Sequence, residues 1–444
     1  MAEHGSIRRQ RFLKNLADLA MRLLYRSVDV HQAFEATVRG PQLGVSNHFG
    51  GLSDPLIQIY ALDRVPRFIG RDLIWKYPVA KQLMNFVGAI PVHKPDDSVG
   101  GGVARNDQMF ASTYAALEDG DLVVIFPEGI TVDDPAIAPI KTGAARIALG
   151  ARAQGVTGIE IIPSGIHYED KAVLRSKAYV HVGDPIDLDA WVEEHAAPGE
   201  AQDSSNRALV TELTAAIESL LRRAAPNFED WQEARTMMEA SAIALRNVPG
   251  ASADVGYGDE SALSDELATR SEGDKKRIGV ALDVYEADLD AAGLTDEQMM
   301  SRQSSRASFL WRVVWNAGVG LVLLPFALIG LVINILPMVG VWLVGKVRVA
   351  PAMMATLKPG AAIVLFSIAW GFAAWSGWKL GGFRGVAAVL LLMPLYLFAL
   401  VAVVERVTLA GRAIGGRARS GRGDLHESVV EDRTAVVESV ADAL

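Results

Sequence analysis

The chain has 444 residues, a net charge of −9 and a hydrophobic fraction of 50%. Its positive mean hydropathy is high for a soluble protein and indicates contact with a membrane. The absence of cysteine excludes disulfides, a thiol nucleophile and thiolate metal sites. Basic residues are dispersed and lack an aromatic platform, which argues against a nucleic-acid-binding protein.

Residues 1–26 are predicted to form a basic amphipathic helix at the membrane interface. Cations alternate there with apolar residues at helical spacing, for example Phe12, Leu16 and Leu23. Charges interrupt the apolar stretch, so the segment is not a signal peptide. The alternative is a helix packed on the domain behind it, and one helix can do both on different faces.

The central motif is a turn that begins at His48 and reaches Asp54. Gly50 and Gly51 permit a bend, and Pro55 starts a new element. The bend brings Asp54 back toward one ring nitrogen of His48 and leaves the other nitrogen to accept a proton. A histidine held in this way is a general base toward a hydroxyl, an effect worth roughly 10²–10⁴ in rate. The competing interpretation is an ordinary polar turn.

Alternating strands and helices predict an α/β domain over residues 27–245, with a mixed central sheet flanked by helices. Residues 121–126, for example, form a short apolar run bounded by turn residues, which is typical of a buried strand. Ligands of such folds bind where loops leave the strand ends. His48, Lys94 and Glu128 all follow predicted strands and are therefore grouped as one site.

Two polar segments precede the apolar C-terminal region and one follows it. Residues 246–273 are rich in glycine, serine, alanine and acids, and are predicted to be an acidic flexible linker. Residues 274–308 are predicted to be a helical segment with one apolar stripe. Residues 411–444 are predicted to be a polar cytosolic tail.

Residues 309–410 are predicted to be a transmembrane region with two hairpins. Residues 313–335 contain no charge, and residues 361–378 and 386–404 are two further runs of span length. The first run continues to Val344, so it is either one tilted helix with an interfacial tail or a tight re-entrant hairpin. Basic residues flank the runs, which favours a plasma (inner) membrane protein, multi-pass, with its catalytic domain on the cytoplasmic face.

Four motifs, in this order, resemble those of the glycerol-phosphate acyltransferase superfamily, the 1-acylglycerol-3-phosphate and glycerol-3-phosphate O-acyltransferases. They are Asn47-His48 with Asp54, Gly88–Lys94, Phe126–Gly129 and Ile161–Ser164. The resemblance covers about residues 20–235. The apolar C-terminal region, with Lys358 in a polar break, is similar to that of the subgroup related to fungal glycerol-3-phosphate acyltransferases.

The resemblance implies a glycerol-3-phosphate acyltransferase-like fold with His48 as general base and Asp54 as its orienting partner. It also implies a phosphate site, first at Lys94. Further cationic candidates are Arg71, Lys141 and Arg146.

Glu128 and Gly129 are expected to meet the glycerol hydroxyls, the first through its carboxylate and the second by letting the backbone approach. The alternative for Glu128 is a buried carboxylate satisfied by neighbouring amides. Backbone amides near the histidine turn or the Glu128 loop are the expected oxyanion donors.

Two features depart from the family pattern. Five residues separate His48 from Asp54, one more than in the commonest signature. Lys94 stands where the family often carries arginine, and lysine lacks the bidentate fork of a guanidinium. These departures keep a catalytically inactive lipid-binding membrane protein open as an alternative.

The resulting function hypothesis is a membrane-bound O-acyltransferase of phospholipid synthesis, acting on glycerol-3-phosphate or 1-acylglycerol-3-phosphate. Its donor is an acyl thioester, on coenzyme A or on acyl carrier protein, and its other partner is the lipid bilayer. No cofactor and no metal are expected, because the histidines lack ligand spacing. The alternative enzyme acylates another lysophospholipid or a glycolipid.

Overall fold

The computed structural model describes residues 7–32, 40–92, 102–131, 133–247, 255–292, 294–296, 299–300, 306–419 and 424–444. The chain divides into two compact units. The first comprises residues 1–231 together with 350–356, and the second comprises residues 232–349 and 357–444.

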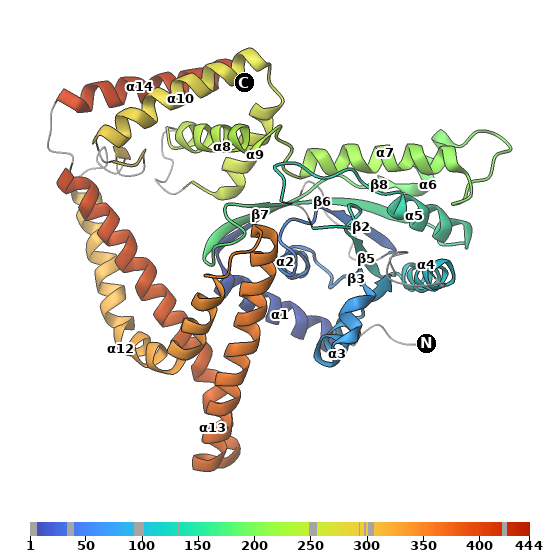
Figure 1. The fold of residues 1–444 in the computed structure, drawn as a ribbon, viewed down its shortest axis with the longest axis horizontal. Coiled ribbons are helices and arrows are strands. Elements are labelled where there is room, and N and C mark those ends of the chain that lie inside the picture. The colour runs from blue at the N-terminus through green and yellow to red at the C-terminus, as the bar shows by residue number, and fades with distance from the viewer. Residues whose placement is uncertain are drawn as a thin grey trace. The chain divides into compact units, whose positions relative to one another are not determined.

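The first unit is built on a mixed sheet, whose described strands have the order β1-β7-β6-β2-β5-β3-β4, with β8 paired to β6 (Figure 1). The strands are β1 (Tyr25–Gln32), β2 (Gln42–Ser46), β3 (Arg67–Arg71), β4 (Ile90–Val92), β5 (Leu122–Ile125), β6 (Glu160–Tyr168), β7 (Ser176–Val182) and β8 (Ile186–Asp187). Strands β6, β2, β5, β3 and β4 run parallel to one another, whereas β7 and β8 are antiparallel to β6. The predicted α/β fold with a mixed sheet is confirmed.

Helices cover both faces of this sheet (Figure 1). They are α1 (Ile7–Leu24), α2 (Ser53–Ala61), α4 (Gly102–Glu118), α5 (Gly143–Ala153), α6 (Leu188–His195) and α7 (Arg207–Ala224). The 3₁₀ helix η1 (Asp72–Lys76) and helix α3 (Pro78–Val87) pack on each other. Val123 and Ile161 pack in a cluster with α4, α5 and α7, whereas Val124 and Ile162 pack with α1 and α2. Because both faces are buried, the central strands are continuous apolar runs rather than alternating ones.

Helix α1 is the predicted N-terminal amphipathic helix. Ala17 and Met21 are buried against the domain. Phe12 and Leu16, on the same helix, remain 56% and 48% exposed. One face of α1 is therefore part of the core, and the predicted interfacial role remains available to the other.

The second unit contains a group of helices, α8 (Trp231–Leu245), α9 (Tyr257–Ala268), α10 (Glu272–Ala292) and α14 (Asp424–Ala443). Helix α14 packs along α10. The buried guanidinium of Arg433 on α14 pairs with Asp296 at 2.8 Å and donates to Asn247 at 2.9 Å. The hydroxyl of Tyr285 on α10 donates to the same Asp296 at 2.8 Å.

Two predicted segment assignments are corrected by this unit. The segment predicted as a flexible linker, residues 246–273, contains helix α9, in which Tyr257 and Leu267 are buried. The predicted polar tail, residues 411–444, contains α14, which is fixed by the buried Arg433–Asp296 pair. Local composition missed both helices because the groups that hold them lie far away in the sequence.

The apolar region consists of helices α12 (Arg306–Val344) and α13 (Pro351–Arg419). In the described part of the chain, these two helices are long and apolar enough to cross a membrane, which suggests membrane association. Helix α13 has two arms that meet at Gly382, whose φ of 56° is not helical. The arms carry the two spans that were predicted at residues 361–378 and 386–404.

Helix α12 follows both arms of α13 in turn. Its first half runs antiparallel to the second arm: Ala327 packs with Leu400, and Gly330 lies against the backbone of Tyr396. Its second half runs antiparallel to the first arm. There, Trp370 Nε1 donates to Asn334 Oδ1 at 3.0 Å, and Gly340 lies against Leu365.

Helix α12 must reverse its direction between these two sets of contacts. The arms of α13 form a hairpin, in which the backbones of Gly377 and Gly385 lie against each other beside Gly382. A helix that is antiparallel to both arms of a hairpin turns back on itself, as the ribbon of α12 does in Figure 1. Pro337 follows the reversal within one turn and accounts for the bend, because proline interrupts the helical hydrogen bond to the residue four positions before it.

Candidate active site

His48 follows β2 at the edge of the sheet where the parallel strands end. The chain turns through Gly50 and Gly51, and Asp54 lies in the first turn of α2. The His48 ring nitrogen Nδ1 is 2.7 Å from Asp54 Oδ2, and the Gly50 N–H donates to both oxygens of the same carboxylate at 2.9 and 3.0 Å. The structure thus contains the hydrogen bond that the glycine turn predicts.

Gly50 is required at its position by close packing. A Cβ there would lie 2.5 Å from the Tyr168 hydroxyl and 2.7 Å from Asp54 Oδ1. Asp54 has no room to move, because it is fully buried. Any larger residue would push the turn away from the carboxylate that holds His48.

Tyr168, at the end of β6, is the main residue of this site that the sequence did not predict. Its hydroxyl donates to Asp54 Oδ1 at 2.5 Å. Burial raises the pKa of Tyr168 well above its usual value, so the hydroxyl keeps its proton and remains a donor. Asp54 thus accepts hydrogen bonds from Tyr168, Gly50 and His48, which fixes the orientation of its carboxylate.

The His48 imidazole is held from the side by Phe126, whose ring stacks on it at 4.3 Å between centroids. A carboxylate only accepts hydrogen bonds, so the contact with Asp54 assigns the ring proton to Nδ1. The nitrogen Nε2 then carries a free lone pair. The side chain of His48 is 22% exposed, so its ring is not sealed inside the domain.

Glu128 ties the histidine loop to the loop that follows β5. Its carboxylate accepts from the His48 backbone N–H at 2.8 Å and from the Ala138 N–H at 3.0 Å. Burial raises the pKa of Glu128, and these two amides partly offset the effect. The geometry favours the alternative of a buried carboxylate satisfied by amides over the predicted contact with glycerol hydroxyls.

Gly129 and Lys141 lie together beside this loop. The Lys141 N–H donates to Pro127 O at 2.9 Å, and a Cβ on Gly129, whose φ is 67°, would lie 2.6 Å from Lys141 Nζ. The structure therefore places Lys141, one of the predicted cations, beside Gly129 in the Glu128 loop.

Residues 27–167 match the family model described as Acyltransferase. These residues form an acyltransferase domain. The match covers the sheet edge that carries the His48–Asp54 pair and the Glu128 loop.

Two yeast proteins are similar to parts of this chain. Glycerol-3-phosphate O-acyltransferase 2 of Saccharomyces cerevisiae is 35% identical over 127 residues, which is 28% of this chain and 16% of that protein. Glycerol-3-phosphate O-acyltransferase 1 of the same yeast is 33% identical over 88 residues, 19% of this chain and 12% of that protein. The matches thus span less than a fifth of the length of these relatives.

One solved structure is also similar, the 1-acyl-sn-glycerophosphate acyltransferase PlsC from Thermotoga maritima. The TM-score is 0.33 and the sequence identity 17%, over 48% of this chain and 80% of that one.

The remaining predicted cations of the acyltransferase domain are distributed over different places. Arg71 ends β3 and is exposed at the same sheet edge as His48, with β5 between their strands. Lys94 lies outside the described residues. Arg146 does not join the site: its guanidinium lies 5.3 Å from the centre of the Phe110 ring, between α5 and α4.

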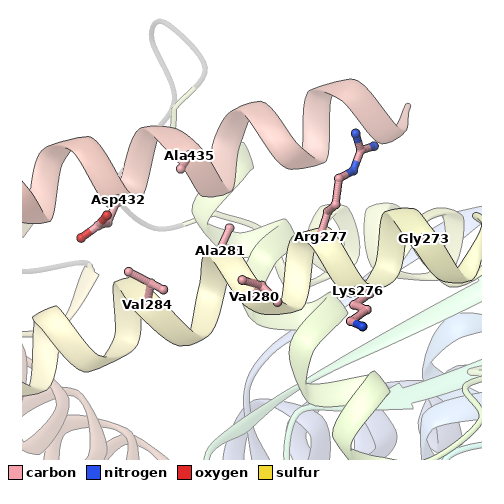
Figure 2. Close-up of a pocket in the computed structure, with 8 residues that line it drawn as sticks. All are labelled: Gly273, Lys276, Arg277, Val280, Ala281, Val284, Asp432 and Ala435. Carbon is pink, nitrogen blue, oxygen red and sulfur yellow. The ribbon is translucent and has the colours of Figure 1, made fainter.

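Two surface hollows elsewhere do not contain His48, Asp54 or Glu128. A groove of about 450 Å³ between α10 and α14 is lined by residues such as Val280, Val284 and Asp432 (Figure 2). A second hollow of about 630 Å³ is lined by Tyr114 and Arg146 beside α4. The acyltransferase site is recognised by its hydrogen bonds and not by these hollows.

Replacing Glu128 with glutamine is expected to destabilise the domain. The amide would place an NH₂ group against one of the two backbone N–H donors, and an unsatisfied buried donor costs about 1–3 kcal/mol. Thermal unfolding of the detergent-solubilised protein should show a lower midpoint for Glu128→Gln. Glu118→Gln, at an exposed glutamate at the end of α4, is the control and should unfold like the wild type. Equal midpoints for all three proteins would show that Glu128 is not a structural link.

Proposed function

We propose that the chain is a membrane-bound O-acyltransferase that moves a fatty acyl group from a thioester to a hydroxyl of glycerol-3-phosphate or 1-acylglycerol-3-phosphate. The observation that carries this proposal is the His48–Asp54 pair, 2.7 Å apart, within an acyltransferase domain. The similarity to two yeast glycerol-3-phosphate acyltransferases supports the choice of acceptor.

In the proposed mechanism, His48 Nε2 removes the proton of the acceptor hydroxyl as its oxygen attacks the thioester carbonyl. Asp54 stabilises the imidazolium that forms. The tetrahedral oxyanion is stabilised by backbone N–H donors near the histidine turn or the Glu128 loop. The intermediate collapses, the carbon–sulfur bond breaks, and the imidazolium returns its proton to the departing thiolate.

The donor in this proposal is an acyl thioester of coenzyme A or of acyl carrier protein, and the reaction requires no cofactor or metal. The phosphate of the acceptor would be met by cations at the same sheet edge. Lys141 is supported by its place beside Gly129, and Arg71 by its place at the end of β3. Lys94 is proposed from its position after β4, the strand next to β3.

A labelled acyl thioester assay with the purified protein tests the choice of acceptor. The panel contains glycerol-3-phosphate, 1-acylglycerol-3-phosphate, a lysophosphatidylcholine and a glycolipid, with both thioester carriers. We expect labelled product with a glycerol phosphate acceptor. Product with only the other lipids would instead identify the alternative enzyme, and no product with any acceptor would favour the inactive lipid-binding protein.

We further propose that the protein is a multi-pass protein of the plasma (inner) membrane with its acyltransferase domain on the cytoplasmic face. Lys346, Arg348 and Lys358 flank the connection between α12 and α13, and basic segments of this kind prefer the cytoplasm. Because α12 bends back and α13 is a hairpin, both helices would begin and end on the same side. The 39 residues of α12 are about as long as two full crossings without any turn, so we propose that it is re-entrant.

The absence of cysteine makes this topology directly testable. Single cysteines at Lys346 and at Ala441 in α14 are expected to react with a membrane-impermeant maleimide from the same side of the membrane. A cysteine at Leu380, beside the Gly382 turn, is expected not to react from that side. Labelling of the first two positions from opposite sides would contradict the hairpin arrangement of α13.

A further inference from the structure

The first turn of α13 lies against the start of α2, the helix that carries Asp54. Residues 350–356 belong to the same compact unit as the sheet, although the rest of α13 belongs to the other unit. Ser53 Oγ donates to Ala355 O at 3.3 Å, and the Leu52 N–H donates to Thr356 Oγ1 at 3.4 Å. These contacts join residues about three hundred positions apart.

The contact is buried. Ser53 and Ala355 are each 1% exposed, and Met354 is 6% exposed. The first turn of α13 is therefore packed into the domain, and its polar groups meet partners there instead of water.

Helix α2 has no side-chain cap of its own. The first backbone N–H groups of a helix have no partner within it and are usually satisfied by a side chain just before the helix. Leu52 occupies the cap position of α2 and supplies no side-chain acceptor. Thr356 of α13 accepts a hydrogen bond from the Leu52 N–H, one of these first N–H groups.

Neighbouring side chains also link Ser53 to the catalytic carboxylate. The Tyr25 hydroxyl lies between the side chains of Ser53 and Tyr168 and has one proton to donate to either of them. Tyr168 in turn donates to Asp54. The Ala355 carbonyl is thus at one end of a series of contacts that has Asp54 at the other.

We infer that the first turn of α13 is part of the active-site scaffold, with Thr356 and Ser53 as positioning residues for the His48–Asp54 pair. The inference rests on the proposed acyl transfer for its kinetic consequence. It means that the acyltransferase site is completed by the start of an apolar helix, so that catalysis depends on how that helix is held.

Thr356→Val tests this inference, because valine keeps the shape of threonine and removes the oxygen. Because this variant loses one hydrogen bond, we expect its kcat to be about 2- to 10-fold lower than that of the wild type. The KM for the acceptor should be unchanged. Ser53→Ala is expected to give a decrease of similar size. Thr356→Ser keeps the hydroxyl and is expected to restore the wild-type rate.

Thr408→Val, on the second arm of α13, is the matched control. Thr408 Oγ1 bonds only to its own helix, at Val404 O, and its replacement is expected to leave kcat unchanged. Wild-type kcat in both Thr356→Val and Ser53→Ala would overturn the inference.

Hydrogen–deuterium exchange provides a readout that does not need turnover. The peptide that covers residues 48–58 is expected to exchange faster in Thr356→Val than in the wild type or in Thr408→Val. If the wild type transfers no acyl group, the proposed function fails, and exchange still decides the inference. Equal exchange in all three proteins would overturn it.

Discussion

His48→Ala is expected to lower the rate of acyl transfer by about 10²–10⁴, the range typical of a lost general base. The reason is geometric: Nδ1 is occupied by Asp54 at 2.7 Å, so Nε2 is the nitrogen that remains to take the hydroxyl proton. Alanine removes this nitrogen and leaves the backbone N–H that bonds to Glu128. The rate should be measured with saturating acceptor and acyl thioester in reconstituted membranes.

The loss must come from chemistry and not from misfolding. His48→Ala should therefore reach the membrane fraction in wild-type amount and unfold at a similar temperature. His195→Ala is the matched control, because His195 lies at the end of α6, where its ring stacks on Trp191. His195→Ala should transfer at the wild-type rate. Turnover by His48→Ala within a factor of about three of wild type would remove His48 from the mechanism.

Asp54→Asn has the second-largest expected effect, a decrease in kcat of about 10²–10³. The asparagine side chain keeps the shape of aspartate but carries only one acceptor oxygen. Its NH₂ group would face a donor, either Tyr168 or His48, in a fully buried position. The His48 ring then loses both its fixed tautomer and the negative charge that stabilises the imidazolium.

The acceptor KM separates this effect from a general disturbance of the site. Asp54 touches no expected substrate position, so its replacement should change kcat and leave the acceptor KM within about two-fold. A variant that binds acceptor poorly but turns over at the wild-type rate would show that Asp54 shapes the binding site and does not orient His48.

The catalytic turn was predictable because its determinants are local. Two glycines between His48 and Asp54 permit the bend, and the apolar residues before it mark the strand. The central strands were equally visible, since burial on both faces makes them uninterrupted apolar runs. The order of the strands in the sheet depends on pairing between distant segments, which one sequence does not display.

The supporting residues were not predictable, because each acts across a long sequence separation. Tyr168 reaches Asp54 over 114 positions and Thr356 reaches Leu52 over 304. Neither lies in a motif that distinguishes it from other polar residues. Glu128 was found by its position after a strand, but its role depends on two backbone donors that only the fold brings together.

The arrangement of the helices beyond the acyltransferase domain also depends on contacts between residues far apart in the sequence. The length of the apolar run that ends at Val344 left one tilted helix and a re-entrant hairpin as alternatives, and the contacts of α12 with both arms of α13 favour the second. Residues of α14 were predicted to be a polar tail from their composition. The ion pair between the buried Arg433 and Asp296 joins this helix to a distant part of the chain, which composition does not show.

The account depends most on His48 and Asp54 acting as a single unit, and a double-mutant comparison measures this directly. The rates of His48→Ala, Asp54→Asn and the double variant should be compared with one acceptor under identical conditions. Residues that act as a unit are not additive, so we expect the double variant to be as slow as His48→Ala alone, within a factor of about three. A double variant in which the two losses multiply would contradict the account, because Asp54 would then act independently of the imidazole.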